Sequence, residues 1–350
     1  MKKQHLILIA LVLNYIVLPA QTDSTKTLVV LGDQEAELTY NQAIQSYNEK
    51  NYEKALIEFT QAINAKPGFY KALYNRGNLR NMMADWNGAV QDFDKVTEIN
   101  PGMNQAYFAR GYAKINLKQF DAAIEDFRIA QNAGYDKPNL FYYKGMAYFQ
   151  AEKYTEAIDE YTKAIELNPQ YTYAYNDRGT AYKLLKKYQE SIDDYNKAIE
   201  TAPMLPFLYV HLGTVKLLTE DFSGAIDDFT KAIDIDNKNI TAINYRGSTY
   251  FKLKEYSKAI ADFESCIAID NNFYIAYNGL ANTYMKMEKY PLAIENYTKA
   301  ININSQFAEA YFNRGSAKEL SRDFDGACAD WNMAKTLGMD VNPLYLNDCN

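Results

Sequence analysis

Apolar and small residues recur along this chain at helical spacing, in blocks that repeat every 34 residues. In one block Tyr175, Gly179 and Tyr182 follow at i, i+4 and i+7, so they share one face of a helix. The second half of each block has a small residue, an aromatic residue four positions later and then another small residue, which predicts a second helix. The nine blocks begin at residues 36, 70, 104, 138, 172, 206, 240, 274 and 308.

Three positions give the block its outline. Glycine stands at position 8 in seven blocks, as Gly77, Gly111, Gly145, Gly179, Gly213, Gly247 and Gly315, while Ala43 and Ala281 keep the register. Position 17 is aromatic in all nine, as Tyr52, Trp86, Phe120, Tyr154, Tyr188, Phe222, Tyr256, Tyr290 and Phe324, and lies at the expected turn between the two helices. Position 18 is predicted to cap the second helix through Asn87, Asp121, Thr155, Ser223, Ser257 and Asp325.

This pattern resembles the tetratricopeptide repeat, a 34-residue helix–turn–helix with Gly at position 8, Ala at 20, an aromatic residue at 24 and Pro at 32. The resemblance covers residues 36–341. It implies an all-α, right-handed superhelical solenoid of nine helix–turn–helix units. A terminal repeat must have its apolar face covered, so residues 342–350 are expected to form a short capping helix.

A pair of charged positions also follows the period. Position 7 is basic and position 23 is acidic in the same six blocks, as Arg76/Asp92, Arg110/Asp126, Lys144/Glu160, Arg178/Asp194, Arg246/Asp262 and Arg314/Asp330. In the eighth block both charges are absent together, at Leu280 and Asn296. We predict an ion pair between the two helices of each of the six blocks. The alternative is two separate solvated faces that happen to share a period.

The amino-terminal residues predict export. Lys2 and Lys3 precede an apolar run from Leu6 to Leu18, and Ala20 offers a small residue for cleavage, so residues 1–20 are predicted to be a signal peptide. The run is shorter than the roughly 18–20 residues needed to span a membrane, which disfavours the alternative of an uncleaved anchor. Its composition resembles signal peptides of Bacteroidetes-type bacteria. Residues 21–35 are assigned to a linker, and localisation in the periplasm or at the cell surface is expected.

Charge and motif content exclude several functions. The formal net charge is −7 and no basic run is present, so the chain is a poor candidate for binding nucleic acid. Beyond residue 20 the one histidine is His211, and no phosphate-binding glycine loop, His-Glu-x-x-His or Cys-x-x-Cys occurs. We therefore predict no catalytic residues, no metal site and no cofactor. No membrane span is expected after signal cleavage.

The three cysteines have different expected roles. Cys266 replaces the small residue of a core position, which predicts a buried free thiol. Cys328 lies on the last repeat helix and Cys349 in the tail, so in an oxidising compartment a Cys328–Cys349 disulfide could hold the cap in place.

The resemblance implies an inner groove lined by first-helix positions 2, 5, 6, 9, 12 and 13. The candidate groove residues are Tyr74, Asn75, Asn78, Met82, Phe108, Tyr112, Tyr142, Tyr143, Met146, Phe149, Asn176, Asp177, Lys183, Tyr245 and Asn282. Aromatic and Met side chains suit peptides, and Asn amides can hold a peptide backbone. The alternative is that many of these rings pack within the stack.

The function expected from this groove is that of a non-catalytic scaffold for a protein or peptide partner. Two other functions stay open. One is binding of glycan or peptidoglycan by stacking on exposed rings, and the other is an accessory role in an envelope assembly or secretion complex.

Overall fold

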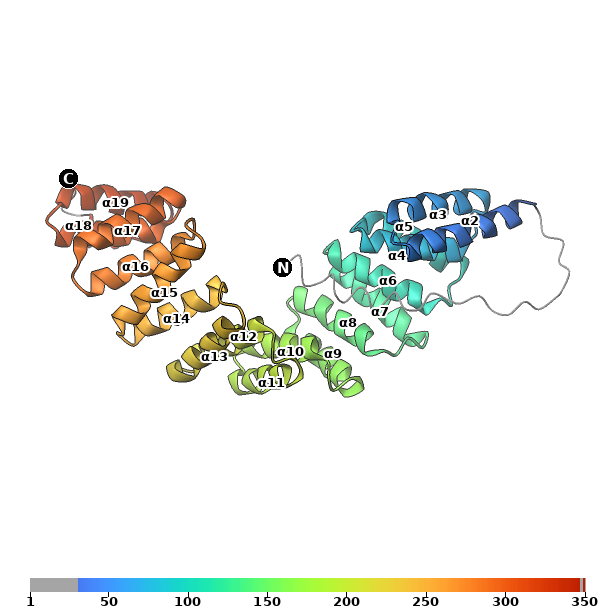
Figure 1. The fold of residues 1–350 in the computed structure, drawn as a ribbon, viewed down its shortest axis with the longest axis horizontal. Coiled ribbons are helices and arrows are strands. Elements are labelled where there is room, and N and C mark those ends of the chain that lie inside the picture. Colours follow the sequence, from blue (N-terminus) through green and yellow to red (C-terminus); the bar gives the residue numbers. More distant parts are fainter. Residues whose placement is uncertain (1–30, 347–348, 350) are drawn as a thin grey trace. The chain divides into compact units, whose positions relative to one another are not determined.

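The computed structural model describes residues 31–346 and residue 349. The predicted signal peptide and residues 21–30 of the predicted linker lie outside this part. Within it the regular elements are eighteen α-helices, α2 to α19, and one 3₁₀ helix, η1 (Figure 1). The expectation of an all-α chain built from consecutive helix pairs is confirmed.

The described part of the chain divides into two compact units, one ending at Pro169 and the other beginning at Gln170, and each is described by itself. Consecutive helices of the first unit pack against each other, both within a pair and between one pair and the next. Its helices are α2 (Leu31–Asn48), α3 (Tyr52–Ala65), α4 (Tyr70–Met82), α5 (Trp86–Ile99), α6 (Asn104–Asn116), α7 (Phe120–Asn132), α8 (Pro138–Gln150) and α9 (Tyr154–Leu167).

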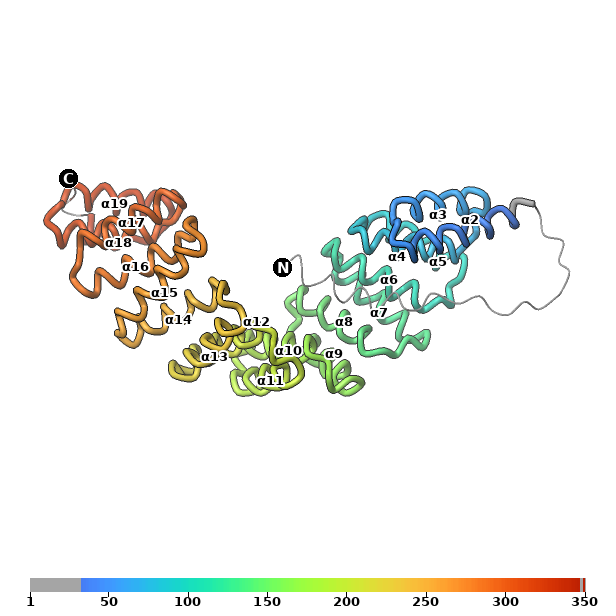
Figure 2. The backbone as a smooth tube through the Cα atoms, viewed as in Figure 1, coloured from blue at the N-terminus to red at the C-terminus, as the bar shows by residue number. Residues whose placement is uncertain are grey.

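The second unit follows the same plan, and its backbone can be traced in Figure 2. The first helices of adjacent pairs also contact each other: α10 contacts α12, and α16 contacts α18. Its elements are α10 (Thr172–Leu184), α11 (Tyr188–Thr201), α12 (Pro206–Leu218), α13 (Phe222–Ile235), α14 (Ile240–Lys252), α15 (Tyr256–Ile269), α16 (Tyr274–Lys286), α17 (Tyr290–Ile303), α18 (Ala308–Leu320), α19 (Phe324–Thr336) and η1 (Pro343–Tyr345).

The first helix begins earlier than the repeat pattern suggests. Residues 31–35, assigned to the linker, belong to α2, which has 18 residues where the other first helices have 13. Asp33 in this extra turn forms an ion pair with Lys66 at 3.1 Å. The linker boundary is therefore corrected to precede Leu31.

The turn inside each pair starts with a residue in the left-handed conformation. Nine residues have φ between 59° and 64°, namely Lys50, Ala84, Lys118, Glu152, Lys186, Glu220, Lys254, Glu288 and Arg322. The following residue donates its backbone N–H to a carbonyl five residues back, as Asp85 does to Arg80 at 2.8 Å, and this closes the first helix.

The residue after this left-handed position is also the N-cap of the second helix. Asn51, Asp85, Asp221 and Asp323 accept a hydrogen bond from the backbone N–H three residues later. The caps predicted at Asn87, Asp121, Thr155, Ser223, Ser257 and Asp325 are wrong by two residues. The turn is so tight that the second helix already begins at the aromatic residue of position 17.

Glycine at position 8 lets the two helices of a pair approach closely. A Cβ atom on Gly111 would lie 2.8 Å from the ring of Phe127, and one on Gly213 would lie 2.6 Å from the ring of Phe229. Both rings are fully buried. The aromatic residue of the second helix therefore fills the space that a side chain on the first helix would need.

All six predicted ion pairs form. Their shortest N–O distances are 2.6 Å for Arg76–Asp92, 2.6 Å for Arg110–Asp126, 3.2 Å for Lys144–Glu160, 2.7 Å for Arg178–Asp194, 2.8 Å for Arg246–Asp262 and 2.6 Å for Arg314–Asp330. Arg246 also donates from Nη1 to Thr230 Oγ1 of the preceding repeat at 3.1 Å. The pairs therefore join helices within a repeat and help to join neighbouring repeats.

The carboxyl-terminal segment covers the last helix pair with the short helix that was expected, which is a single 3₁₀ turn, Pro343–Tyr345. The ring of Tyr345 lies 5.0 Å from that of Trp331, between ring centroids. A disulfide joins Cys328 to Cys349, with an Sγ–Sγ distance of 2.04 Å. Cys266 is a buried free thiol, and burial raises its pKa to about 12.

Candidate functional site

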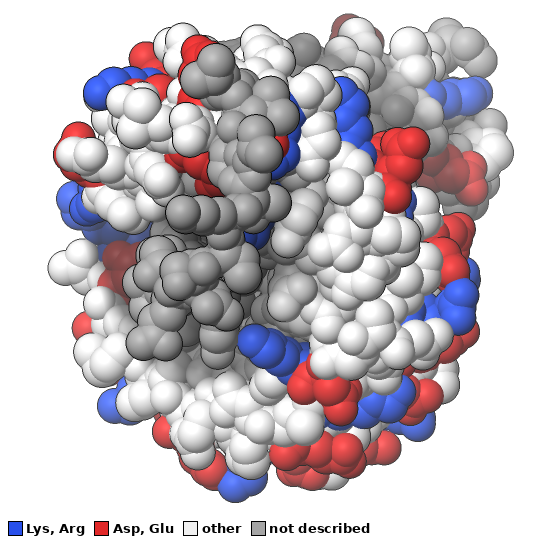
Figure 3. All heavy atoms as spheres, turned by 90° about the vertical axis from the view of Figure 1, so that its right-hand side faces the viewer, with Lys and Arg blue, Asp and Glu red and all other residues white. Residues whose placement is uncertain are grey.

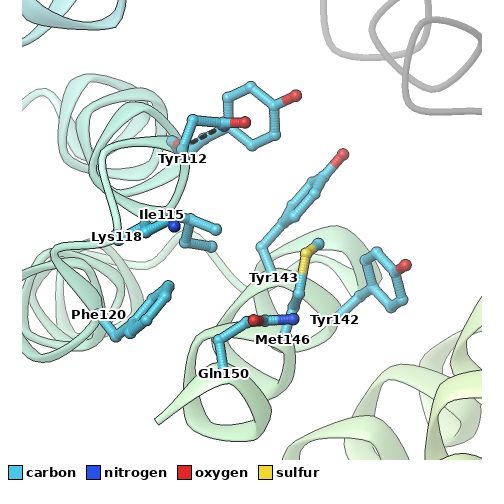
Figure 4. Close-up of a pocket in the computed structure, with 9 residues that line it drawn as sticks. Tyr112, Ile115, Lys118, Phe120, Tyr142, Tyr143, Met146 and Gln150 are labelled. Carbon is cyan, nitrogen blue, oxygen red and sulfur yellow. Dashed lines mark hydrogen bonds between the residues drawn. The ribbon is translucent and has the colours of Figure 1, made fainter. Parts of the chain in front are cut away.

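A pocket opens in the first unit between α6 and α8, the first helices of two adjacent repeats, and the start of α7 closes one side (Figure 4). Its volume is about 430 Å³, within the range of small-ligand and side-chain pockets. The lining residues are Tyr112, Ile115, Asn116, Lys118, Phe120, Tyr142, Tyr143, Met146 and Gln150.

Helical spacing explains why these residues meet. Tyr142, Met146 and Gln150 stand at i, i+4 and i+8 on α8, and Tyr112 and Asn116 stand at i and i+4 on α6. The Tyr112 and Tyr143 rings lie edge to face, with centroids 5.0 Å apart. The walls are therefore aromatic and Met side chains from two different repeats.

The rim of the pocket is polar. Asn116 and Gln150 are exposed, and Asn116 donates to the backbone oxygen of Tyr112 at 2.9 Å. Burial raises the pKa of Tyr112, so its phenol is neutral and can donate a hydrogen bond near pH 7. Lys118 adds one positive charge at the rim. The pocket thus combines apolar walls with a few groups that can hydrogen-bond a ligand.

Four of the candidate groove residues line this pocket: Tyr112, Tyr142, Tyr143 and Met146. Tyr142 and Tyr143 are 6% and 4% exposed, so they form its floor and their rings are mostly held within the stack. Tyr142 contacts the Tyr161 ring at 5.9 Å.

Other candidates of the first unit serve packing. Phe108 is 2% exposed and stacks on Tyr135, with ring centroids 4.8 Å apart, so its assignment to a ligand groove is corrected.

Further candidates of this unit also take part in internal contacts. Tyr74 and Met82 pack against the core cluster of this unit. Asn75 donates to the Tyr40 hydroxyl at 2.8 Å, Phe149 contacts Tyr154 at 5.4 Å and Asn78 hydrogen-bonds Tyr74. These side chains are therefore engaged with partners on their own helix, on the second helix of the repeat, on the preceding first helix or on the segment after α7.

Asparagine side chains of the second unit form hydrogen bonds within the protein, so they are less available to bind a peptide backbone than expected. Asn176 is buried and donates to Asp177 Oδ1 at 2.8 Å. Asn282 accepts hydrogen bonds from the Tyr297 hydroxyl and from Asn313 Nδ2. The partner of Asn176 Nδ2 lies on the same helix, α10, and the partners of Asn282 Oδ1 lie on α17 and α18, so both amides are already engaged.

Tyr245 and Lys183 remain accessible in the second unit. Tyr245 is 37% exposed and stacks one face on Phe229 at 5.5 Å, which leaves its outer face available. Lys183 is partly exposed, and burial lowers its pKa. Neither residue lines the α6–α8 pocket of the first unit.

His211 belongs to the packing of α10, α11 and α12. Its Nδ1 lies 2.8 Å from Asn176 Oδ1 and therefore donates a hydrogen bond to it. The Tyr195 and Phe207 rings lie on either side, at 5.6 and 5.7 Å. Burial and, to a smaller extent, the Lys183 ammonium lower the pKa of His211 to about 4, so the imidazole is neutral near pH 7.

This burial predicts a loss of stability in acid. Unfolded His211 takes up a proton near pH 6.5 while folded His211 resists it until about pH 4, so its stabilising contribution is complete above pH 6.5 and is lost as the pH falls. Between pH 7 and pH 5 the loss should be about 2 kcal/mol. Urea unfolding of wild type and His211→Gln at both pH values checks this. A difference between the two proteins that is the same at both pH values would contradict it.

Sequence reasoning missed five lining residues: Ile115, Asn116, Lys118, Phe120 and Gln150. Ile115, Asn116 and Gln150 occupy positions 12 and 13, which the resemblance assigns to the groove, so a signal was present. Phe120 was placed at the end of a helix pair, and only the structure shows that this end borders the next repeat.

Other kinds of site find little support in the part of the chain that the structure describes. No group of three or more His, Cys, Asp or Glu side chains there could hold a metal ion. No helix among those residues is long and apolar enough to cross a membrane. On the face seen in Figure 3, Lys and Arg are interspersed with Asp and Glu around an area that carries neither.

Comparison with known proteins identifies repeats along about half of the described chain. Models of the TPR repeat match residues 145–186 and 281–320, and models of the tetratricopeptide repeat match residues 172–204, 105–131 and 242–273. A search of curated proteins finds no match.

Solved structures with similar folds include a tetratricopeptide repeat protein from Parabacteroides merdae and part of a TPR repeat-containing protein from Cytophaga hutchinsonii. The first is 19% identical, with a TM-score of 0.56 over 69% of this chain and 97% of that chain. The second is 19% identical, with a TM-score of 0.58 over 69% and 98%. The Cut9–Hcn1 hetero-tetramer of APC/C is 12% identical, with a TM-score of 0.52 over 90% and 76%. At these identities the likeness concerns the fold alone. The nine helix pairs, their 34-residue register and the repeat models together show that this chain belongs to the tetratricopeptide repeat family.

Proposed function

We propose that this protein is a non-catalytic scaffold that binds a segment of a partner protein on the first helices of its first unit. The observation that carries the proposal is the pocket between α6 and α8, with its aromatic and Met walls and its polar rim. Repeat stacks of this family serve protein–protein interaction, which supports a protein or peptide as the occupant.

The chemistry of the pocket suits an apolar side chain of an extended or helical peptide. Such a side chain would enter between Tyr112, Tyr143 and Met146, whose flexible thioether adapts to different shapes. Asn116 and Gln150 at the rim each offer amide donors and an acceptor to the peptide backbone. A central apolar anchor surrounded by polar groups is the usual arrangement of a binding hot spot.

We place this scaffold in the periplasm or at the cell surface. The charged and apolar character of residues 1–20 supports export, and the Cys328–Cys349 disulfide is of the kind that persists in oxidising compartments. The partner is accordingly expected among envelope proteins.

Replacing Met146 with lysine tests the pocket. We expect partner capture to fall at least about tenfold, because the ammonium would enter an apolar pocket without a counter-charge. Crosslinking in cells followed by quantitative mass spectrometry of captured proteins measures it. The matched control is Ser248→Lys, which places the same charge at the same repeat position on α14 of the second unit.

The outcomes separate the proposed functions. A protein captured by wild type and Ser248→Lys but lost from Met146→Lys supports the pocket and names the partner, including a subunit of an envelope or secretion complex. An unchanged set of captured proteins would contradict the pocket. Retention on insoluble peptidoglycan without any captured protein would favour a glycan ligand.

A further inference from the structure

A second pocket lies at the carboxyl end of the chain, between α18, α19 and the tail. Its volume is about 380 Å³. The lining residues are Glu319, Phe324, Cys328, Trp331, Asn342, Leu344 and Tyr345. The proposed partner binding does not account for it.

This pocket occupies the same place in the repeat as the α6–α8 pocket. Ile115 and Phe120 line the first pocket from positions 12 and 17, and Glu319 and Phe324 line the second from those same positions. The first helix of a following repeat closes the first pocket, and the tail takes that place in the second. The tail is a short 3₁₀ turn, so it covers the last repeat incompletely and leaves a cavity.

Three aromatic rings border this cavity. Trp331 is only 4% exposed and forms the base of the cavity, and the Tyr345 ring, which is 38% exposed, lies against it at 59° with centroids 5.0 Å apart. The Phe324 side chain is 62% exposed, whereas Trp86 at the same repeat position contacts Tyr112 of the next repeat at 6.0 Å. The accessible aromatic surface of the cavity is thus that of Phe324 and Tyr345.

The charge of the pocket is negative. Glu319 is its charged lining residue, and the structure shows no ion pair for it with any described side chain. The neighbouring Lys318 is engaged with Asp330 at 2.9 Å, and so does not neutralise it. An aromatic face attracts a cation through its quadrupole, and the carboxylate adds direct attraction.

We propose that this pocket binds a quaternary ammonium group in contact with the Phe324 and Tyr345 rings, above Trp331 at the base and opposed by Glu319. A guanidinium group would fit the pocket less well, because the group has five N–H donors and the pocket offers few acceptors. The Oδ1 atom of Asn342 already accepts from the backbone N–H of Leu344 at 3.0 Å. A quaternary ammonium has no N–H donor, needs no hydrogen bonds and is recognised by aromatic faces.

The disulfide supports the site. Cys328 lines the pocket on α19, and its bond to Cys349 ties the tail that carries Tyr345 to the last helix pair. Ligand binding should therefore weaken when a phosphine reductant cleaves this disulfide.

The test uses Trp331 as a reporter. Trp86→Phe leaves Trp331 as the single tryptophan. Phenylalanine occupies the same repeat position in other repeats, so the substitution should be tolerated. Choline chloride is titrated at constant ionic strength, beside 3,3-dimethylbutan-1-ol, its neutral isostere. We expect saturable quenching, with a Kd for choline about tenfold below that of the alcohol.

Variants make the test specific. Glu319→Gln keeps the shape of the side chain, Tyr345→Leu keeps apolar bulk, and each should weaken choline binding about five- to tenfold. Tyr112→Leu, in the pocket of the first unit, is the matched control and should bind choline as the parent does. Equal affinity for choline and the neutral alcohol, or unchanged binding by Glu319→Gln, would overturn the proposal. Comparing choline with trimethyllysine amide then distinguishes a free small molecule from a modified protein side chain, and either ligand binding above the alcohol supports the site.

Discussion

Asp262→Ala should lower the free energy of unfolding of the second unit by about 3 kcal/mol. Asp262 is 6% exposed and accepts two hydrogen bonds from Arg246, at 2.8 and 2.9 Å. Its removal would leave a guanidinium between α14 and α15 without a carboxylate. Urea unfolding followed by circular dichroism measures the total loss, and hydrogen exchange of the α14 and α15 amides shows whether the loss is local.

The chain itself provides the control for this prediction. The eighth repeat has Leu280 and Asn296 at the positions of the pair, and Asn296 Nδ2 donates to the Leu292 carbonyl at 2.8 Å. The double variant Arg246→Leu/Asp262→Asn introduces the residues of the eighth repeat at this pair. Its free energy of unfolding should lie within about 1 kcal/mol of that of wild type. If the double variant were as unstable as Asp262→Ala, the loss would come from something other than the unpaired charge.

Cys349→Ser should destabilise the last repeat by about 3 kcal/mol, the expected contribution of a disulfide closing a 21-residue loop. The tail packs Tyr345 against Trp331 and Phe312, so its release would also uncover the rings at the end of the stack. Urea unfolding of the Trp86→Phe protein, followed by Trp331 fluorescence, reports on this region.

The same prediction has a chemical check. Denatured, unreduced protein should present one free thiol, that of Cys266. Three free thiols would show that the bond does not form. Cys266→Ala is the stability control, because alanine occupies this repeat position in Ala62, Ala164 and Ala300, and little change is expected.

The sequence predicted the helix pairs and the ion pairs because both depend on contacts that recur with the period. Arg246 and Asp262 are 16 residues apart, the distance between facing positions of two antiparallel helices in one repeat. Any contact inside a repeat or between identical neighbours is repeated in the sequence and can be read from it.

The caps and the pocket were harder to predict because they depend on irregular features. Non-glycine residues such as Ala84 adopt a left-handed conformation, and composition gave no sign that the second helix would begin so early. Whether a ring such as Phe108 faces a ligand or Tyr135 depends on where the segment between α7 and α8 places Tyr135. Positions 5, 6 and 9 were assigned to a groove, but the exposure of their side chains could not be predicted from residue type alone.

The sequence by itself determined the repeat, its register, the residues of the core and the pairing of charges, because helical periodicity and side-chain size encode them locally. Only the tertiary structure decided which groove residues are used up in packing and which line a pocket. It also decided that the tail closes the last repeat as a 3₁₀ turn and leaves a cavity beside Trp331. The physical reason is that a pocket exists where packing between two specific segments is incomplete, and no single segment carries that information.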